Sequence, residues 1–145
     1  MKKKNASMTM LRSKDLSATK PRIQVLDILF KNNSPMSIDD IVKETKGKIA
    51  ISSAYRVIAD LMDVNIVNTF QSPDSKLLVE LAQDDSSHHH HLYCTSCKKA
   101  TDIELDASLE ENINQLINKI SKSNNITITD HFFELYGECD SNNHK

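Results

Sequence analysis

Four consecutive histidines, residues 88–91, are followed three residues later by a C-x-x-C pair, Cys94 and Cys97. In an extended strand successive side chains point to opposite faces. The even-numbered histidines would therefore face one way and the odd-numbered ones the other. A short strand would supply two imidazoles to each of two metal sites, and its thiolates would hold a third ion. A solvated histidine-rich loop or a cloning tag fits less well, because the run lies in mid-chain and continues into the cysteine pair.

The distribution of charge separates the chain into two parts. Residues 1–83 carry 13 Lys and Arg against 9 Asp and Glu, whereas residues 84–145 carry 5 against 11 together with all six histidines. The 145 residues suffice for one ordinary domain or two small ones. A basic front half and an acidic, histidine-rich back half are typical of a nucleic-acid-binding unit joined to a cation-binding unit.

The three cysteines indicate metal chemistry in a reducing compartment. An odd number cannot all pair, and the spacing of Cys94 and Cys97 is that of a metal knuckle or a redox pair. The pair follows a predicted strand instead of opening a helix, which favours metal over thioredoxin-like chemistry. Lys2-Lys3-Lys4 is not followed by the apolar segment of a secretory signal, and no stretch approaches the ~18 apolar residues of a membrane span. We therefore expect a cytoplasmic protein without membrane contact.

Two short helices are predicted in the front half from their capping residues. Thr19 can cap the first, with Pro21 in its first turn, where a missing N–H does no harm. Ser37 can cap the second, with acidic residues near its positive end. Residues 1–13 are expected to be poorly ordered or marginally helical.

A third helix and a hairpin complete the front half. The helix is predicted from Ser52 or Ser53 to about Asp63, and two alternating segments at 66–70 and 77–81 predict a β-hairpin. Three helices followed by a hairpin form a winged helix-turn-helix pattern. The apolar stripe of the third helix, expected to face the core, comprises Ala54, Val57, Ile58, Leu61 and Met62.

The back half predicts a small α/β unit. Residues 84–87 read as a linker, 101–105 as a second strand and 126–136 as a final extended stretch with a break near Asp130. Between them Ser108 opens a capping box and a helix. A unit of this size, residues 88–145, is small for independent stability, so we expect a homodimer. The fold class is α+β, with an N-terminal winged helix-turn-helix domain over 1–83 and a dimerisation domain after the linker.

The third helix is the predicted recognition helix for double-stranded DNA. Tyr55 and Arg56 lie off its apolar stripe, where Arg can reach guanine or phosphate and the Tyr ring can pack on thymine methyl groups. The alternative, without DNA contact, is that Tyr55 packs against the second domain and Arg56 is solvated. Further DNA contacts are expected from Ser52, Ser53, Arg22 and Lys14.

Several ordered motifs carry a resemblance to a known family. They are Thr19-Lys20-Pro21-Arg22, Ser53 to Ile58, Val79-Glu80-Leu81, His88 to Cys97, and His131 with Tyr136 to Cys139. From about residue 15 onwards the chain resembles the ferric uptake regulator family of metal-sensing transcription factors. The resemblance implies a winged-helix domain, a dimerisation domain and metal-dependent operator binding that usually represses transcription.

The resemblance also implies two metal sites that use the histidine run. The sensing site between the domains would use Glu80, His89, His91 and Asp102. Members usually add a histidine where this chain has Pro35, and a water, Asp84 or Asp85 would take its place. The site in the dimerisation domain would use His88, His90, Glu110 and His131. Strand alternation sorts the four consecutive histidines into the same two sets.

A third, structural zinc site is implied on thiolates. Cys94, Cys97 and Cys139 match the family, whereas the last cysteine is absent and His144 is the expected fourth ligand. The alternative is that Cys139 is a buried small residue and the site is empty.

The sequence is compatible with more than one metal and with more than one function. Zn²⁺ is expected at the structural site, with Zn²⁺, Fe²⁺ or Mn²⁺ at the sensing site. Four consecutive histidines are more typical of the zinc-responsive branch of the family. The lack of a cysteine in the sensing site instead favours iron. A deaminase would need H-x-E and P-C-x-x-C, which the chain lacks, so no enzyme and no small-molecule substrate beyond metal ions is expected. The remaining alternative is a zinc-stabilised interaction module or metal store without sequence-specific DNA binding.

Overall fold

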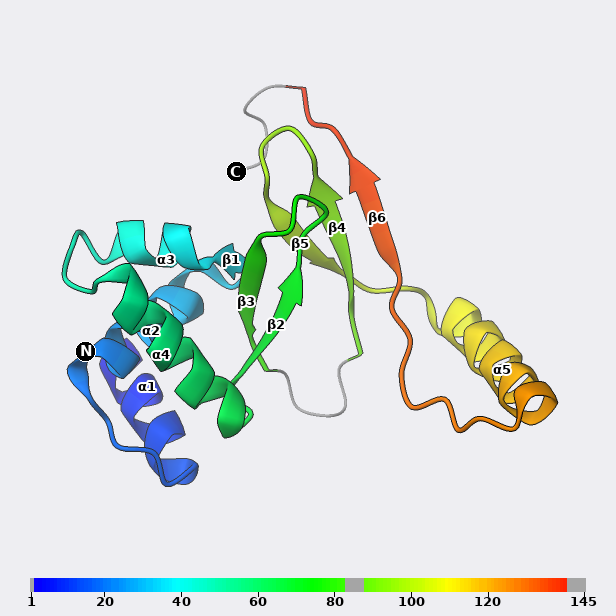
Figure 1. The fold of residues 1–145 in the computed structure, drawn as a ribbon, viewed down its shortest axis with the longest axis horizontal. Coiled ribbons are helices and arrows are strands. Elements are labelled where there is room, and N and C mark those ends of the chain that lie inside the picture. The colour runs from blue at the N-terminus through cyan, green and yellow to red at the C-terminus, as the bar shows by residue number, and fades with distance from the viewer. Residues whose placement is uncertain (1, 83–87, 141–145) are drawn as a thin grey trace. The chain divides into compact units, whose positions relative to one another are not determined.

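The computed structural model describes residues 2–82 and 88–140 of the chain. It separates into two compact units, residues 1–84 and 85–145, and each is described by itself (Figure 1). The predicted linker, residues 84–87, lies outside the described residues.

The N-terminal unit combines four helices with a three-stranded antiparallel sheet of order β1-β3-β2. This is the winged helix-turn-helix that the sequence predicted, with β2 and β3 as the hairpin. The short strand β1 was not predicted, because two residues carry no readable alternation. The elements are α1 (Lys2–Ser13), α2 (Lys20–Asn32), β1 (Met36–Ser37), α3 (Ile38–Glu44), α4 (Ile51–Asp63), β2 (Val67–Gln71) and β3 (Leu77–Leu81).

Residues 2–13 form the helix α1, so the helical one of the two expectations is confirmed and the poorly ordered one was wrong. Leu11 is fully buried, and the Ser7 hydroxyl donates a 2.6 Å hydrogen bond to the Asp27 carboxylate on α2. A short isolated helix is marginal in water, and tertiary contacts of this kind stabilise it. Those contacts are non-local and leave no pattern within the segment itself.

The caps of α2 and α3 fall at the predicted residues. Ser37 is the N-cap of α3, and its Oγ accepts the N–H of Asp40 at 3.1 Å. Thr19 is the N-cap residue of α2 and a proline follows in the first turn, although the Thr19 side chain makes no capping hydrogen bond. Only α3 therefore has a side-chain hydrogen bond at its N-cap.

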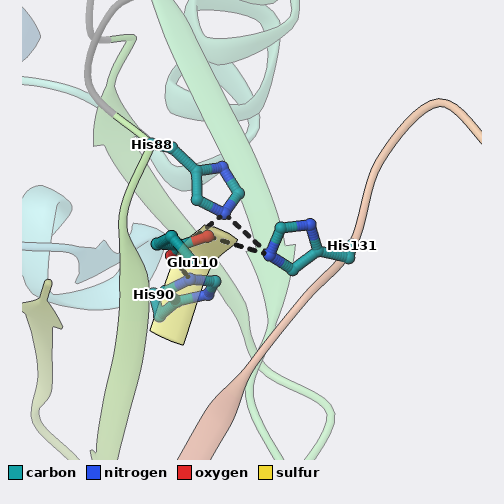
Figure 2. Close-up of side chains that lie close together, drawn as sticks. All are labelled: His88, His90, Glu110 and His131. Carbon is teal, nitrogen blue, oxygen red and sulfur yellow. Dashed lines mark hydrogen bonds and ion pairs between the residues drawn. The ribbon is translucent and has the colours of Figure 1, made fainter. Parts of the chain in front are cut away.

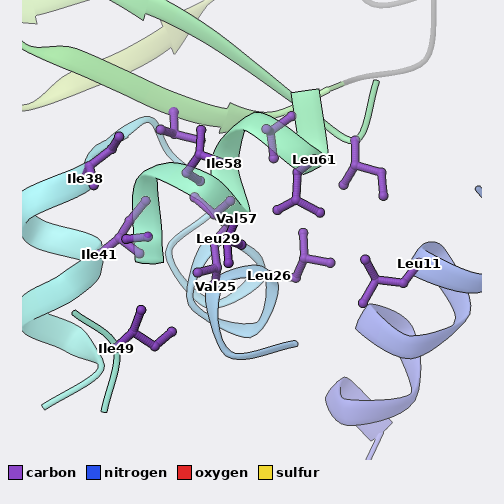
Figure 3. Packing of buried hydrophobic residues seen from close by; sticks show 14 residues of the cluster. Leu11, Val25, Leu26, Leu29, Ile38, Ile41, Ile49, Val57, Ile58 and Leu61 are labelled. Carbon is purple, nitrogen blue, oxygen red and sulfur yellow. The ribbon is translucent and has the colours of Figure 1, made fainter. Parts of the chain in front are cut away.

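The core of this unit gathers buried side chains from all four helices and the sheet (Figure 3). Four of the five residues predicted for the stripe of α4 are buried, but Met62 is 40% exposed and that part of the prediction was wrong. At ~100° per residue, position 62 lies roughly a quarter turn from the middle of the stripe. The cluster comprises Leu11, Val25, Leu26, Leu29, Ile38, Ile41, Ile49, Ala54, Val57, Ile58, Leu61, Ile66, Val67 and Val79.

The C-terminal unit is built on a three-stranded sheet of order β5-β4-β6. The central strand β4 runs antiparallel to β5 and parallel to β6. The extended stretch expected over 126–136 contains a strand only from residue 134, and the chain before it is irregular. The elements are β4 (His90–Cys94), β5 (Ala100–Ile103), α5 (Ala107–Asn124) and β6 (Glu134–Gly137).

The N-cap of α5 is Asp106, so the assignment of Ser108 as the cap was wrong. The Asp106 carboxylate accepts the N–H of Leu109 at 2.9 Å, and the Ser108 hydroxyl donates to the same carboxylate at 2.6 Å. Aspartate and serine cap comparably well, and the helix begins after the earlier of the two. The hydrogen bonds from Ser108 and Leu109 lower the pKa of Asp106 below its ordinary value of 3.8.

This cap predicts a pH-dependent contribution to stability. Because the folded-state pKa of Asp106 is lowered, its stabilisation is fully present above about pH 4 and is lost as the pH falls through the lowered value. Thermal unfolding followed by circular dichroism should show Asp106→Ala melting below the wild type at pH 6, with the gap closing towards pH 2. Glu104→Ala, which changes a nearby carboxylate outside the cap, should not show this closing gap. A gap that stays constant with pH would contradict the assigned cap.

Candidate metal centres and DNA-binding face

Four metal-ligating side chains converge in the C-terminal unit, which we call the histidine–glutamate cluster: His88, His90, Glu110 and His131. They come from the chain leading into β4, from β4 itself, from the first turn of α5 and from the segment before β6 (Figure 2). Figure 2 shows the His88 and His131 rings turned toward the Glu110 carboxylate, with His90 beneath it.

The distances in the histidine–glutamate cluster fit a single bound ion. The Nε2 atoms of His88 and His131 are 3.1 Å apart, and His90 Nε2 lies 2.7 Å from Glu110 Oε1. The remaining separations from Glu110 are 3.8 Å to His88 Nε2 and 3.5 Å to His131 Nε2. Ligands about 2.0–2.1 Å from a tetrahedral zinc ion are roughly 3.3 Å from one another. All four predicted residues are thus brought together with nearly the required spacing.

Electrostatics in the histidine–glutamate cluster favour an anionic carboxylate. The hydrogen bond with His90 is the main cause that lowers the pKa of Glu110, and the nearby His88 and His131 add to it. The His90 side chain is only 1% exposed, whereas that of His88 is 43% exposed. One carboxylate and three imidazoles form a donor set suited to a borderline divalent cation such as zinc or iron(II).

The odd-numbered histidines face a different carboxylate. In the antiparallel β4–β5 pair, His91 lies directly opposite Asp102. Asp102 Oδ1 is 3.7 Å from His91 Nε2 and 3.9 Å from His89 Nε2. Three of the four residues predicted for the sensing site are therefore brought together within this unit.

The other residues tied to the sensing site belong to the N-terminal unit or lie outside the described residues. Glu80 is in β3, opposite Asn68 of β2. Pro35, which replaces the histidine of other members, directly precedes β1. Asp84 and Asp85 fall among the residues that the structure does not describe.

The three cysteines meet at the end of the β4–β6 pair. The Sγ atoms of Cys94, Cys97 and Cys139 all lie within 4.8 Å of one another. Because β6 runs parallel to β4 with Gly137 beside Cys94, Cys139 emerges next to the turn that carries Cys97. The predicted fourth ligand, His144, lies outside the described residues.

The pKa of Cys94 lies below that of an ordinary cysteine. The backbone N–H of Cys97 points at Cys94 Sγ across 3.5 Å, and this is the largest of the causes that lower the pKa of Cys94 to about 6. The hydrogen bond with Cys94 raises the pKa of Cys139 instead. A thiol with a lowered pKa beside two further sulfurs is suited to a zinc–thiolate site.

The predicted DNA-binding side chains of α4 are accessible. Ser52, Ser53, Tyr55 and Arg56 are exposed, as is Lys14 after α1. The Tyr55 side chain, 51% exposed, does not belong to the core of its unit.

Arg22 makes contacts within the N-terminal unit. Its Nη2 lies 2.7 Å from Asp60 on α4, and its Nη1 donates to the carbonyl oxygen of Ser17 at 2.9 Å. The side chain is only 15% exposed. Arg22 therefore links the start of α2 to the recognition helix, a role that the sequence prediction of a phosphate contact did not include.

One exposed residue of α4 was missed by the sequence prediction. Ile51 opens the helix and is 47% exposed. The prediction began the helix at residue 52 or 53, because Ala50, the actual N-cap residue, has no side-chain capping group.

A winged helix-turn-helix with an accessible recognition helix, joined to a unit rich in metal ligands, defines a class of metal-responsive DNA-binding regulators. Comparison with known proteins gives the family. The model of the Ferric uptake regulator family matches residues 13–136, and this chain belongs to that family. It is a transcriptional regulator and not an enzyme.

Relatives cover nearly the whole chain. The ferric uptake regulation protein of Yersinia pestis is 30% identical over 137 residues, covering 92% of this chain and 88% of the relative. That of Escherichia coli K12 is 29% identical and covers 90% and 86%. The crystal structure of the Vibrio cholerae ferric uptake regulator matches with a TM-score of 0.71 at 26% identity, covering 91% and 98%. Within the described residues, no helix combines the length and apolarity that crossing a membrane requires.

If Glu110 is a metal ligand, substitutions of two adjacent carboxylates, Glu110 and Glu111, should affect metal binding differently. Glu110→Gln keeps the shape of the side chain but removes the anionic ligand, and should weaken Co²⁺ or Zn²⁺ binding at this site by about tenfold or more. Glu111→Gln, one position along the exposed surface of α5, should leave binding unchanged. Titration of the metal-free protein with Co²⁺, followed by its visible absorption, measures both. Equal affinities for the two variants would exclude Glu110 as a ligand.

Proposed function

We propose that this protein is a metal-dependent repressor whose homodimer binds operator DNA when an ion joins its two domains. The proposed sensing ligands are Glu80, His89, His91 and Asp102. The observation that carries the proposal is the pair of imidazoles, His89 and His91, set against Asp102 across the β4–β5 ladder. His91 and Asp102 on paired strands, with His89 just before β4, form a partial site that one further carboxylate would complete.

Glu80 suits the role of that carboxylate because of its place in the chain. It lies in β3, the wing strand, two residues before the described part of the N-terminal unit ends. Glu80, His89 and His91 bound to the same ion would restrict how the two domains move against one another. Operator and metal would then stabilise each other's binding reciprocally, by the same factor in each direction.

The ligand types limit which metals suit the sensing site but do not identify one metal. Imidazole and carboxylate suit Zn²⁺, Fe²⁺ and Mn²⁺, and intrinsic affinity among them favours zinc. Related proteins have been solved with different metals: the Francisella tularensis regulator with iron, that of Pseudomonas aeruginosa with manganese, and a zinc uptake regulator with zinc and DNA. We propose Zn²⁺ or Fe²⁺ at the sensing site of this chain.

The other two sites would support the dimerisation domain. His88, His90, Glu110 and His131 would hold one ion between β4, α5 and the chain before β6. Cys94, Cys97 and Cys139 would hold a structural Zn²⁺, with His144 as the proposed fourth ligand. Both ions would cross-link segments that are distant in the sequence.

An uncovered helix face supports assembly with a second copy. None of the 18 residues of α5, all of them described, is buried. Leu109, Leu116 and Ile120 are 40%, 56% and 41% exposed, and Leu135 and Tyr136 on β6 are 45% and 55% exposed. Apolar patches of this kind are typical of a dimer interface. We propose that the dimer acts in the cytoplasm, where operator DNA is accessible.

The sensing role is tested by metal-stimulated DNA binding. Duplexes enriched by the wild-type protein from a random-sequence pool serve as the probe, with fluorescence anisotropy measured against added Zn²⁺ or, without oxygen, Fe²⁺. Glu80→Gln and the double variant His89→Ala, His91→Ala should lose the stimulation, which for coupled sites is typically about 5- to 150-fold. Arg56→Ala should instead weaken DNA binding at every metal concentration.

Glu44→Gln, a carboxylate change elsewhere in the N-terminal unit, serves as the control and should keep the full stimulation. Circular dichroism and size-exclusion chromatography verify that each variant remains a folded dimer. If Glu80→Gln and the double histidine variant respond to metal like the wild type, the proposed sensing site is wrong.

A further inference from the structure

Two apolar side chains stand exposed side by side on the first half of α4. Ile51 is 47% exposed and Tyr55 is 51% exposed. Residues four apart are neighbours on a helix surface, so the two form one small patch, which we call the Ile51–Tyr55 patch. It opens at the first residue of the recognition helix, which is the end that enters the major groove in helix-turn-helix proteins.

Ile51 is not required by the core of its unit. Ile49, two residues earlier, is 4% exposed and Ala54 is fully buried, and both belong to the core cluster. Ile51 does not belong to that cluster. A single exposed isoleucine needs no explanation, but this one adjoins the exposed Tyr55 ring at the N-terminal end of the helix.

The surroundings of the Ile51–Tyr55 patch are suited to DNA. Lys46 and Lys48 are exposed in the loop before α4, and the first turn of the helix contains no acidic residue. Ser52 and Ser53 add hydroxyl groups beside Ile51. Lysine side chains that can contact DNA phosphates thus precede the uncharged Ile51–Tyr55 patch in the chain.

We propose that Ile51 is a specificity-determining residue that packs, together with Tyr55, against the 5-methyl groups of neighbouring thymines in the operator. The thymine methyl is the apolar group that the major groove presents. Isoleucine suits this contact because branching at Cβ restricts its χ1 angle and limits the entropy lost on binding. This inference rests on the proposed function, since it concerns operator DNA, and adds Ile51 to the residues expected to read thymine.

The experiment replaces single thymines by uracil, which removes only the methyl group. The full-length, zinc-loaded protein first enriches its preferred sequence from a random duplex pool. Each thymine of that sequence is then changed to uracil in turn, and Kd is measured for the wild type and for Ile51→Ala. Removal of one buried methyl group corresponds to about a fourfold loss of affinity.

The wild type should show this loss at one or two thymines that Ile51→Ala no longer distinguishes from uracil. Met62→Ala, which removes another exposed apolar side chain of α4, should keep the wild-type pattern. An unchanged uracil pattern in Ile51→Ala, or a change in its oligomeric state by sedimentation, would overturn the inference alone. Failure of the wild type to enrich any sequence would overturn the proposed function with it.

Discussion

The register of one strand, β4, determines where the candidate metal ligands of the C-terminal unit lie. As the middle strand of its sheet it has a hydrogen-bonded neighbour on each side, which fixes its position along both. Side chains alternate between the two faces of a strand, and a slip of one residue would exchange them. That slip would remove His90 from Glu110 and His91 from Asp102 in a single step.

The same pairing connects ligands that are distant in the sequence. The antiparallel neighbour β5 brings Asp102 opposite His91, and the parallel neighbour β6 brings Gly137 beside Cys94, so that Cys139 follows next to the knuckle. The capped first turn of α5 adds Glu110. The N-terminal unit has its own rigid frame, in which the core stripe of α4 leaves Tyr55, Arg56 and Ile51 accessible.

Local and periodic features were predictable from sequence, whereas parallel pairing and competition between neighbours were not. The stripe of α4 and the alternation of the histidines follow from helix and strand geometry, and both predicted groupings within the C-terminal unit are seen in the structure. Met62 lies at the margin of its stripe, where pattern alone does not decide burial. Both Asp106 and Ser108 could cap α5, and Asp106 is the residue that does so. The contacts of α1 and of Arg22 depend on partners far along the chain.

The account depends most on two ions being bound by the alternating histidines at the start of β4, with His88 and His89 just before the strand and His90 and His91 within it. A crystal structure of the protein loaded with zinc or cobalt, with anomalous scattering collected at the metal edge, tests this directly. The account predicts two separate peaks on these ligands, one among His88, His90, Glu110 and His131 and the other beside His89, His91 and Asp102. A single ion held by two consecutive histidines, such as His89 and His90, would contradict it.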